Sequence, residues 1–121
     1  MKRVLIVDDE AQMRGLLEDV LGEDYEVMIA CDGAEALQKL AQDGAELIIT
    51  DVVMPKMNGL DLMVAVRKQY PALKVIAISG GGNIGRLDYL PIASLLGAAR
   101  VIHKPFAVAE MHTAVRELLA A

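Results

Sequence analysis

The chain has 121 residues, enough for one domain with a substantial hydrophobic core. Hydrophobic residues make up 55%, but no apolar run approaches the roughly 18 residues that cross a membrane, so no membrane span is expected. The net charge of −5 and the lack of a basic block exclude nucleic acid and anionic membranes as direct partners. The sole cysteine, Cys31, rules out an internal disulfide and is typical of a cytoplasmic protein.

The first half of the chain predicts alternating strands and helices. Arg3–Val7 is a short apolar run that ends in acids, which indicates a buried strand. Apolar residues at helical spacing follow it as far as Gly22, and a second strand is expected over Tyr25–Ala30. Asp32, followed by a glutamate three residues later, predicts the cap of a second helix. The third strand, Leu47–Asp51, ends in an acid.

The second half continues this alternation. Asn58 predicts the cap of a third helix, and Leu73–Ser79 is expected to be the fourth strand, followed by a glycine-rich stretch at 80–83. A fourth helix is expected over Asp88–Leu96 and a fifth strand over Ala99–His103. The expected buried stripe of the last helix is Val108, Met111, Val115, Leu118 and Leu119.

Strict alternation with short connections indicates a parallel sheet with helices on both faces. Five units are too few for an eight-stranded barrel, so the predicted fold class is α/β, an open doubly wound sheet of five parallel strands. No composition shift or linker divides the sequence. We expect a single domain over residues 1–121, with no output domain after the last helix.

Reactive side chains follow the predicted strands. The carboxyl ends of parallel strands meet at one edge of a sheet, where open α/β folds bind ligands. The side chains expected at that edge are Asp8, Asp9, Asp51, Ser79 and Lys104. Two carboxylates about 4 Å apart repel by roughly 4 kcal/mol at an effective dielectric of about 20, so the cluster must bind protons or a cation. Oxygen ligands with few other donors favour Mg²⁺.

Each of these residues also has a purely structural interpretation. Asp8 and Asp9 could be the acidic N-terminus of a helix, where the helix dipole favours negative charge. Asp51 could cap a turn, Ser79 could belong to a turn, and Lys104 could be solvated surface. Their joint placement at four of five strand ends favours a functional site.

The sequence resembles the receiver domain of bacterial two-component response regulators over its whole length. The features that carry the resemblance are Asp8-Asp9, Asp51 with the stretch Met54–Gly59 after it, Ser79 before a small residue, and Lys104-Pro105-Phe106. The resemblance implies a flavodoxin-like sheet of strand order 2-1-3-4-5. It also implies transfer of a phosphoryl group onto Asp51 from a sensor histidine kinase or a histidine phosphotransfer protein.

The resemblance also implies a role for each site residue. The implied catalytic residues are Asp51 as nucleophile, Ser79 as hydrogen-bond donor to the phosphoryl group, and Lys104 as its counter-charge. The implied Mg²⁺ ligands are Asp9, Asp51 and the carbonyl of Val53, with Asp8 acting through water. Such a module catalyses only its own phosphorylation and dephosphorylation and is not an enzyme for another substrate.

Some positions depart from the family pattern. The aromatic residue that usually stands three positions before the lysine is Val101 in this chain. Side chains that help place the hydrolytic water in the family are replaced by Val53 and Gly81, which predicts a long-lived aspartyl phosphate. The fourth-helix segment 84–98 has more apolar side chains than one inner stripe needs, so it is expected to bind a downstream protein or a second copy of the chain.

Three other functions compete with this interpretation. A dehalogenase-type phosphatase also uses a strand-end aspartate, but its DxDxT pattern is absent after Asp51. A nucleotide binder of the P-loop class would need the GxxxxGK[ST] motif, and this motif is absent from the sequence. The third rival, a receiver fragment of a larger hybrid kinase or regulator, stays open. Cys31 is expected to fill a small space in the core.

Overall fold

The computed structural model describes residues 1–52, 59–79 and 97–120. Its strands are β1 (Arg3–Val7), β2 (Glu26–Ala30), β3 (Leu47–Asp51), β4 (Lys74–Ser79) and β5 (Arg100–His103). Its helices are α1 (Ala11–Leu21), α2 (Gly33–Asp43), α3 (Gly59–Gln69) and α5 (Val108–Leu119). The predicted cap Asn58, the glycine-rich stretch 80–83 and the predicted fourth helix Asp88–Leu96 lie outside the described residues.

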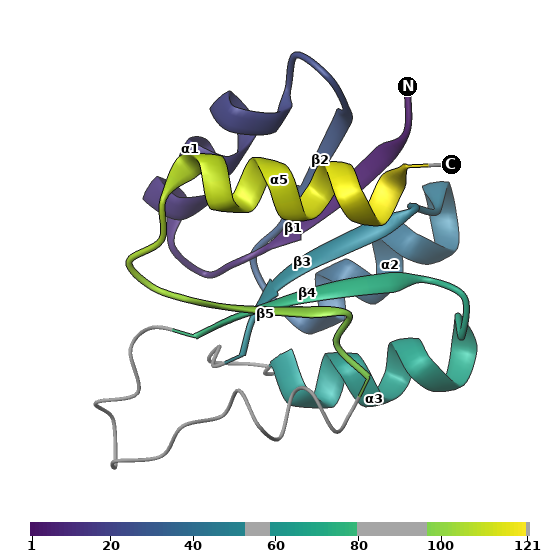
Figure 1. Cartoon of the computed structure of the whole chain (residues 1–121). Helices are drawn as coiled ribbons and strands as arrows, with labels where there is room; N and C mark the ends of the chain where they lie inside the picture. The colour runs from purple at the N-terminus through teal and green to yellow at the C-terminus, as the bar shows by residue number, and fades with distance from the viewer. Residues whose placement is uncertain (53–58, 80–96, 121) are drawn as a thin grey trace, which may run out of the picture.

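The strands form one parallel sheet in the order β2-β1-β3-β4-β5 (Figure 1). This arrangement confirms the predicted α/β class and the strand order 2-1-3-4-5. The central strand β3 is buried along its whole length, as its apolar composition predicts for a strand covered on both faces. The order places β1, β3 and β4 side by side, so that groups at their carboxyl ends share one edge.

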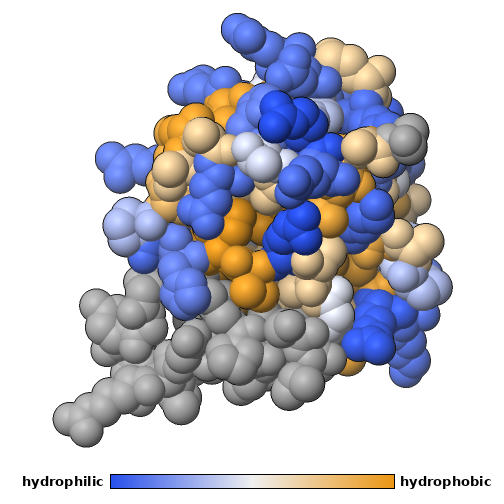
Figure 2. All heavy atoms as spheres, in the orientation of Figure 1, coloured by the Kyte–Doolittle hydropathy of each residue, from blue (hydrophilic) through white to orange (hydrophobic). Residues whose placement is uncertain are grey.

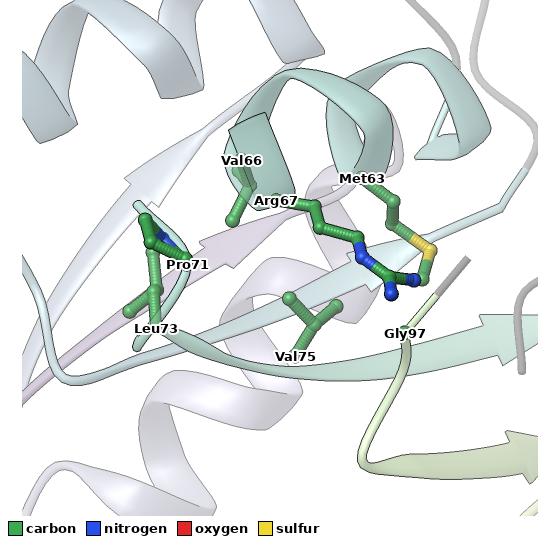
Figure 3. Close-up of a pocket in the computed structure, with 7 residues that line it drawn as sticks. All are labelled: Met63, Val66, Arg67, Pro71, Leu73, Val75 and Gly97. Atoms are coloured by element: carbon green, nitrogen blue, oxygen red, sulfur yellow. The ribbon is translucent and has the colours of Figure 1, made fainter. Parts of the chain in front are cut away.

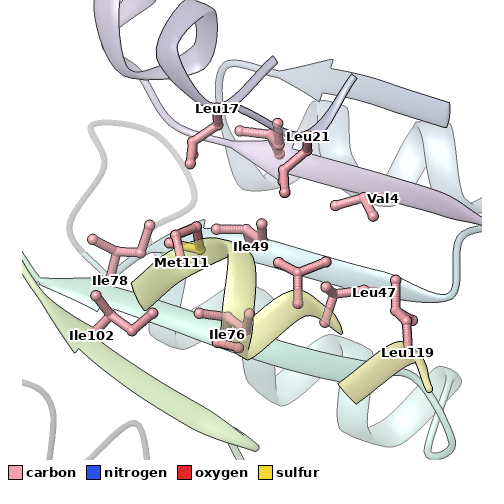
Figure 4. Packing of buried hydrophobic residues seen from close by; sticks show 13 residues of the cluster. Val4, Leu17, Leu21, Leu47, Ile49, Ile76, Ile78, Ile102, Met111 and Leu119 are labelled. Atoms are coloured by element: carbon pink, nitrogen blue, oxygen red, sulfur yellow. The ribbon is translucent and has the colours of Figure 1, made fainter. Parts of the chain in front are cut away.

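Alternate residues of each strand supply two hydrophobic cores. Val4 and Ile6 point to the face covered by α1 and α5, where buried side chains of both helices pack against those of β3 and β4 (Figure 4). Leu5 and Val7 point to the opposite face, which α2 and α3 cover. Burying each such aliphatic side chain contributes about 1.5–3 kcal/mol. Because successive side chains of a strand point to opposite faces, a continuous apolar run supplies both cores. The sheet is therefore covered on both sides.

The predicted cap of α2 is confirmed. The Asp32 side chain accepts a hydrogen bond from the backbone N–H of Glu35 at 2.8 Å, and Glu35 Oε1 accepts one from the backbone N–H of Cys31 at 2.6 Å. The prediction that Cys31 fills a space in the core is wrong, because the residue is exposed. It follows the last residue of β2 and belongs to the turn before α2, where no layer covers it.

Two apolar residues of the predicted helical patterns prove to be exposed. Leu16 is 41% exposed, because α1 presents the stripe of Leu17 and Leu21 to the sheet. Val108 is 49% exposed, since it begins α5 before the helix reaches the core. Figure 2 shows orange hydrophobic residues reaching the surface between blue hydrophilic ones on the side that carries α5.

Among the described residues, none of the helices has both the length and the hydropathy needed to cross a membrane.

Candidate functional site

Two aspartates lie side by side at the carboxyl edge of the sheet. Asp51 is the last residue of β3, and Asp8 directly follows β1. The two strands pair in parallel with Val7 opposite Thr50, which places both aspartates at the same level. Asp8 is 1% exposed and Asp51 is 6% exposed. Two acids buried this deeply require partners that offset their charge.

Asp9 adds a third carboxylate to this pair. One carboxylate oxygen from each of Asp8, Asp9 and Asp51 lies within 4.8 Å of the other two. Unlike the other two, Asp9 is exposed. Its side chain makes no hydrogen bond or ion pair with any residue that the structure describes. The three predicted acids are therefore gathered at one place, with one of them open to solvent.

Lys104 provides the positive charge of the cluster. It follows β5, and its Nζ atom lies 2.9 Å from Asp51 Oδ2. The same atom lies 3.5 Å from Asp8 Oδ2 and 3.5 Å from Glu10 Oε1. The lysine side chain is 14% exposed, so its contacts are largely shielded from water. The structure thus places Lys104 with the strand-end acids, as predicted.

Burial and charge act on the pKa values of this cluster in opposite directions. Burial raises the pKa of the Asp8 carboxyl, and it outweighs the hydrogen bond from the Glu10 backbone and the charge of Lys104. Burial alone would lower the pKa of Lys104, but the hydrogen bond to Asp51 and the surrounding carboxylates outweigh it and raise that pKa. The lysine therefore stays charged, and it cannot neutralise all of the acids around it.

The donor set fits a hard divalent cation. Three carboxylates offer oxygen atoms at one point of the sheet edge, and the exposed position of Asp9 leaves an approach from solvent. Carboxylate oxygens with access to water are the ligands that Mg²⁺ takes in proteins. The excess negative charge of the cluster favours the same ligand. This acidic pocket could therefore bind a metal ion.

The structure says less of the other predicted site residues. Ser79 is the last residue of β4, opposite His103 of β5, so its backbone reaches the same edge; its side chain is not described. Val53 lies outside the described residues. Val101, which replaces the usual aromatic residue, lies in β5 and is 38% exposed.

One contact at the site was not predicted. Arg14 on α1 donates a hydrogen bond from Nη1 to the backbone carbonyl of Asp8 at 2.7 Å. Arg14 stands one helical turn after Glu10, the residue before the first turn of α1, so its side chain can reach back to the end of β1. The spacing of one helical turn between Glu10 and Arg14 is the feature of the sequence from which this contact could have been predicted.

A separate pocket of about 250 Å³ lies between α3 and β4 (Figure 3). Its described lining residues are Met63, Val66, Arg67, Pro71, Leu73, Val75 and Gly97. Arg67 is the one charged residue among them, so this part of the lining holds no acid, thiol or imidazole. The candidate site is therefore the acidic cluster at the carboxyl edge.

A family model described as the response regulator receiver domain matches residues 4–116. The chain belongs to this family. It is thus a receiver domain, the signalling module of two-component systems, and the resemblance stated from the sequence is confirmed. The positions of Asp8, Asp51 and Lys104 at the strand ends lie within the matched residues.

Named relatives carry this receiver domain in different settings. The chain is 33% identical over 120 residues to the transcriptional regulatory protein CpxR of Escherichia coli, covering 98% of this chain and 50% of CpxR. It is 34% identical over 119 residues to the sensor kinase CckA of Brucella abortus, covering 96% of this chain and 12% of CckA. The crystal structure of the receiver domain of NtrX from Brucella abortus matches with a TM-score of 0.86 and 32% identity, covering 96% of this chain and 97% of that one. The chain therefore spans half or less of the length of these two curated relatives.

Proposed function

We propose that this receiver domain accepts a phosphoryl group on Asp51 from a sensor histidine kinase or a histidine phosphotransfer protein. The observation that carries the proposal is the contact of 2.9 Å between Asp51 Oδ2 and Lys104 Nζ inside a cluster of three carboxylates. This contact orients the buried carboxylate of Asp51 and places the positive charge of the Lys104 ammonium group beside it. Positioning and charge stabilisation are most of what phosphoryl transfer asks of a protein.

In the proposed reaction, a carboxylate oxygen of Asp51 attacks phosphorus and forms the new phosphorus–oxygen bond. The phosphorus–nitrogen bond of the donor phosphohistidine breaks, and the imidazole leaves with the electron pair. Lys104 offsets charge that develops on the phosphoryl oxygens, and the Ser79 hydroxyl donates a hydrogen bond to one of them. The domain acts on itself alone, so it is a signalling module and not an enzyme for another substrate.

The cluster also supports a role for Mg²⁺. Asp9, Asp51 and the backbone carbonyl of Val53 would bind the ion directly, and Asp8 would bind it through water. When bound, the ion supplies positive charge next to the incoming phosphoryl group. The part played by Val53 follows from the family resemblance, since the residue lies outside the described ranges.

An apolar surface beside the cluster supports a protein as the donor. A pocket of about 320 Å³ is lined by Met13, Leu16, Lys104, Pro105 and Phe106. Lys104 lines this pocket and also contacts Asp51, so the pocket is next to the proposed phosphoacceptor. A partner protein that delivers a phosphoryl group to Asp51 would therefore contact the pocket. Apolar surface of this kind suits a protein partner. These partners, and this chain, would operate in the cytoplasm.

The output of the domain is proposed to run through the fourth helix and the adjacent face, toward a downstream protein or a second copy of the chain. That helix lies outside the described residues, so this part stays a prediction. A second candidate is a receiver unit within a larger hybrid kinase or regulator. It is favoured by CpxR and CckA, of which the chain matches only a part.

The proposal is tested by incubating the protein with acetyl phosphate and Mg²⁺ and measuring intact mass. We expect one phosphoryl group on the wild type and on Asp43→Asn, an exposed acid at the end of α2, but none on Asp51→Asn. Excess chelator is expected to stop the labelling. Labelling of Asp51→Asn at the wild-type level would overturn the assignment.

A further inference from the structure

The backbone just after β1 is held from two sides. The N–H of Asp8 donates to the carbonyl of Ala30 at 3.1 Å, which extends the contact with β2 by one residue. The carbonyl of Asp8 lies past the last strand pair of the ladder, and it accepts the hydrogen bond from Arg14 Nη1 at 2.7 Å. Arg14 therefore anchors the peptide unit that joins Asp8 to Asp9.

Asp9 depends on that anchor for its place. One oxygen of its carboxylate lies within 4.8 Å of an oxygen of each of the two buried acids, which repel it, and its side chain makes no hydrogen bond or ion pair with a described residue. Asp8, in contrast, has both carboxylate oxygens engaged, Oδ1 by the Glu10 backbone N–H at 2.9 Å and Oδ2 by Lys104 at 3.5 Å. Only the backbone is left to keep Asp9 in the cluster.

We propose that Arg14 is a positioning residue for cation binding, which acts by holding the Asp8–Asp9 peptide so that the Asp9 carboxylate faces Asp51. This inference rests on the proposed function, because it takes Asp9 as a ligand of Mg²⁺. Arg14 contacts a carbonyl oxygen and competes with the cation for no carboxylate. Without it, the peptide relaxes and Asp9 turns away from its like-charged neighbours.

The test measures Mg²⁺ affinity by isothermal titration calorimetry on the full chain. Arg14→Met is expected to weaken binding about tenfold, as loss of a group that orients a ligand typically does. Arg116→Met, which removes the same charge from the last turn of α5, is the matched control and should match the wild type. Arg14→Lys keeps a donor for the carbonyl and should retain most of the affinity.

A double-mutant cycle with Asp9→Asn separates positioning from a general structural effect. If Arg14 acts through Asp9, Arg14→Met causes no further loss of affinity once Asp9 is replaced. Additive losses, or an affinity of Arg14→Met equal to that of Arg116→Met, would overturn the inference. Should Arg14→Met fail to fold, Arg14→Gln, which is shorter and uncharged, takes its place in the cycle, and Arg14→Lys remains the variant expected to retain most of the affinity.

Amide hydrogen exchange in the presence of chelator gives a readout that needs no metal. Arg14→Met should speed exchange at the amides of Asp8 and Glu10, which donate to the Ala30 carbonyl and to Asp8 Oδ1, and it should leave α5 unchanged. Unchanged exchange at these amides would contradict the anchoring role. If the wild type binds no Mg²⁺, the Mg²⁺ role in the proposed function is wrong. The exchange rates alone then decide whether Arg14 holds the Asp8–Asp9 peptide.

Discussion

The Nζ atom of Lys104 lies 2.9 Å from Oδ2 of Asp51, although 53 positions separate the two residues. Because β4 lies between β3 and β5, the lysine reaches past the end of a whole strand to the centre of the sheet. It also lies 3.5 Å from Asp8 Oδ2. Lys104 and a bound cation would therefore compete for the same carboxylates. The lysine should weaken binding of the metal ion, but it should speed phosphoryl transfer.

Replacing Lys104 should separate these two roles. In Lys104→Met the competing ammonium is gone, so we expect Mg²⁺ to bind roughly tenfold more tightly, which is about 1.4 kcal/mol. Labelling by acetyl phosphate should become slower by at least about tenfold at saturating Mg²⁺, because Lys104 no longer offsets the charge on the phosphoryl oxygens. Calorimetry and the rate of labelling check the two effects. Lys68→Met, at the end of α3, serves as the control, and parallel changes of both quantities would contradict the argument.

The buried charge of Asp8 should make stability fall as the pH rises. Because burial raises the folded-state pKa of Asp8 above its ordinary value of 3.8, protonation favours the folded state. This contribution is fully present below the unfolded pKa and is lost as the pH rises through the folded pKa. At neutral pH the wild type therefore carries the cost of a buried carboxylate.

Asp8→Asn should remove that cost. With chelator present at neutral pH, we expect the variant to be more stable by about 1 kcal/mol, which raises Tm by roughly 4 °C in a domain of this size. The gain should shrink as the pH falls through the raised folded-state pKa of Asp8, and it should vanish below the ordinary value of 3.8. Thermal melts followed by circular dichroism over this range measure it. A gain that does not depend on pH would point to packing and not to charge.

The exposed apolar surface beside Lys104 should matter for a protein donor and not for a small one. Leu16 is 41% exposed and lines the pocket next to Lys104, while Val64 on α3 is 51% exposed and does not line it. We expect Leu16→Ala to slow phosphotransfer from a cognate histidine kinase at least about fivefold, since a partner loses apolar contact. Its labelling by acetyl phosphate should equal that of the wild type. If Val64→Ala slows phosphotransfer as much, the docking surface is placed wrongly.

The lifetime of the aspartyl phosphate should depend on Val53. Its side chain cannot hydrogen-bond the hydrolytic water, so we expect phosphorylated wild type to decay slowly. Val53→Asn supplies a polar side chain at this position and should shorten the half-life several-fold. Loss of the phosphorylated form after removal of acetyl phosphate, followed by intact mass, gives both rates. Equal half-lives would show that this position does not control hydrolysis.

The amino-acid sequence alone determined the layer structure and the place of the acids. Runs rich in apolar residues predicted every described strand to within one residue. The inner strands β1, β3 and β4 are rich in apolar residues because both of their faces are covered, whereas the edge strands β2 and β5 are partly exposed. The alternation of strands and helices implied a parallel sheet, and a parallel sheet brings its carboxyl ends to one edge. Asp8, Asp51 and Lys104 could therefore be assigned to one site before any distance was known.

Only the tertiary structure decided which contacts these side chains make. Leu16 and Cys31 are exposed because no neighbouring helix or strand covers them. The spacing of apolar residues along the sequence does not show which positions a neighbouring element will cover. The hydrogen bond from Arg14 to the Asp8 carbonyl depends on the angle at which α1 leaves β1. Long side chains such as arginine have many rotamers, and packing selects one of them. Residue pattern thus placed the reactive groups, and packing oriented them.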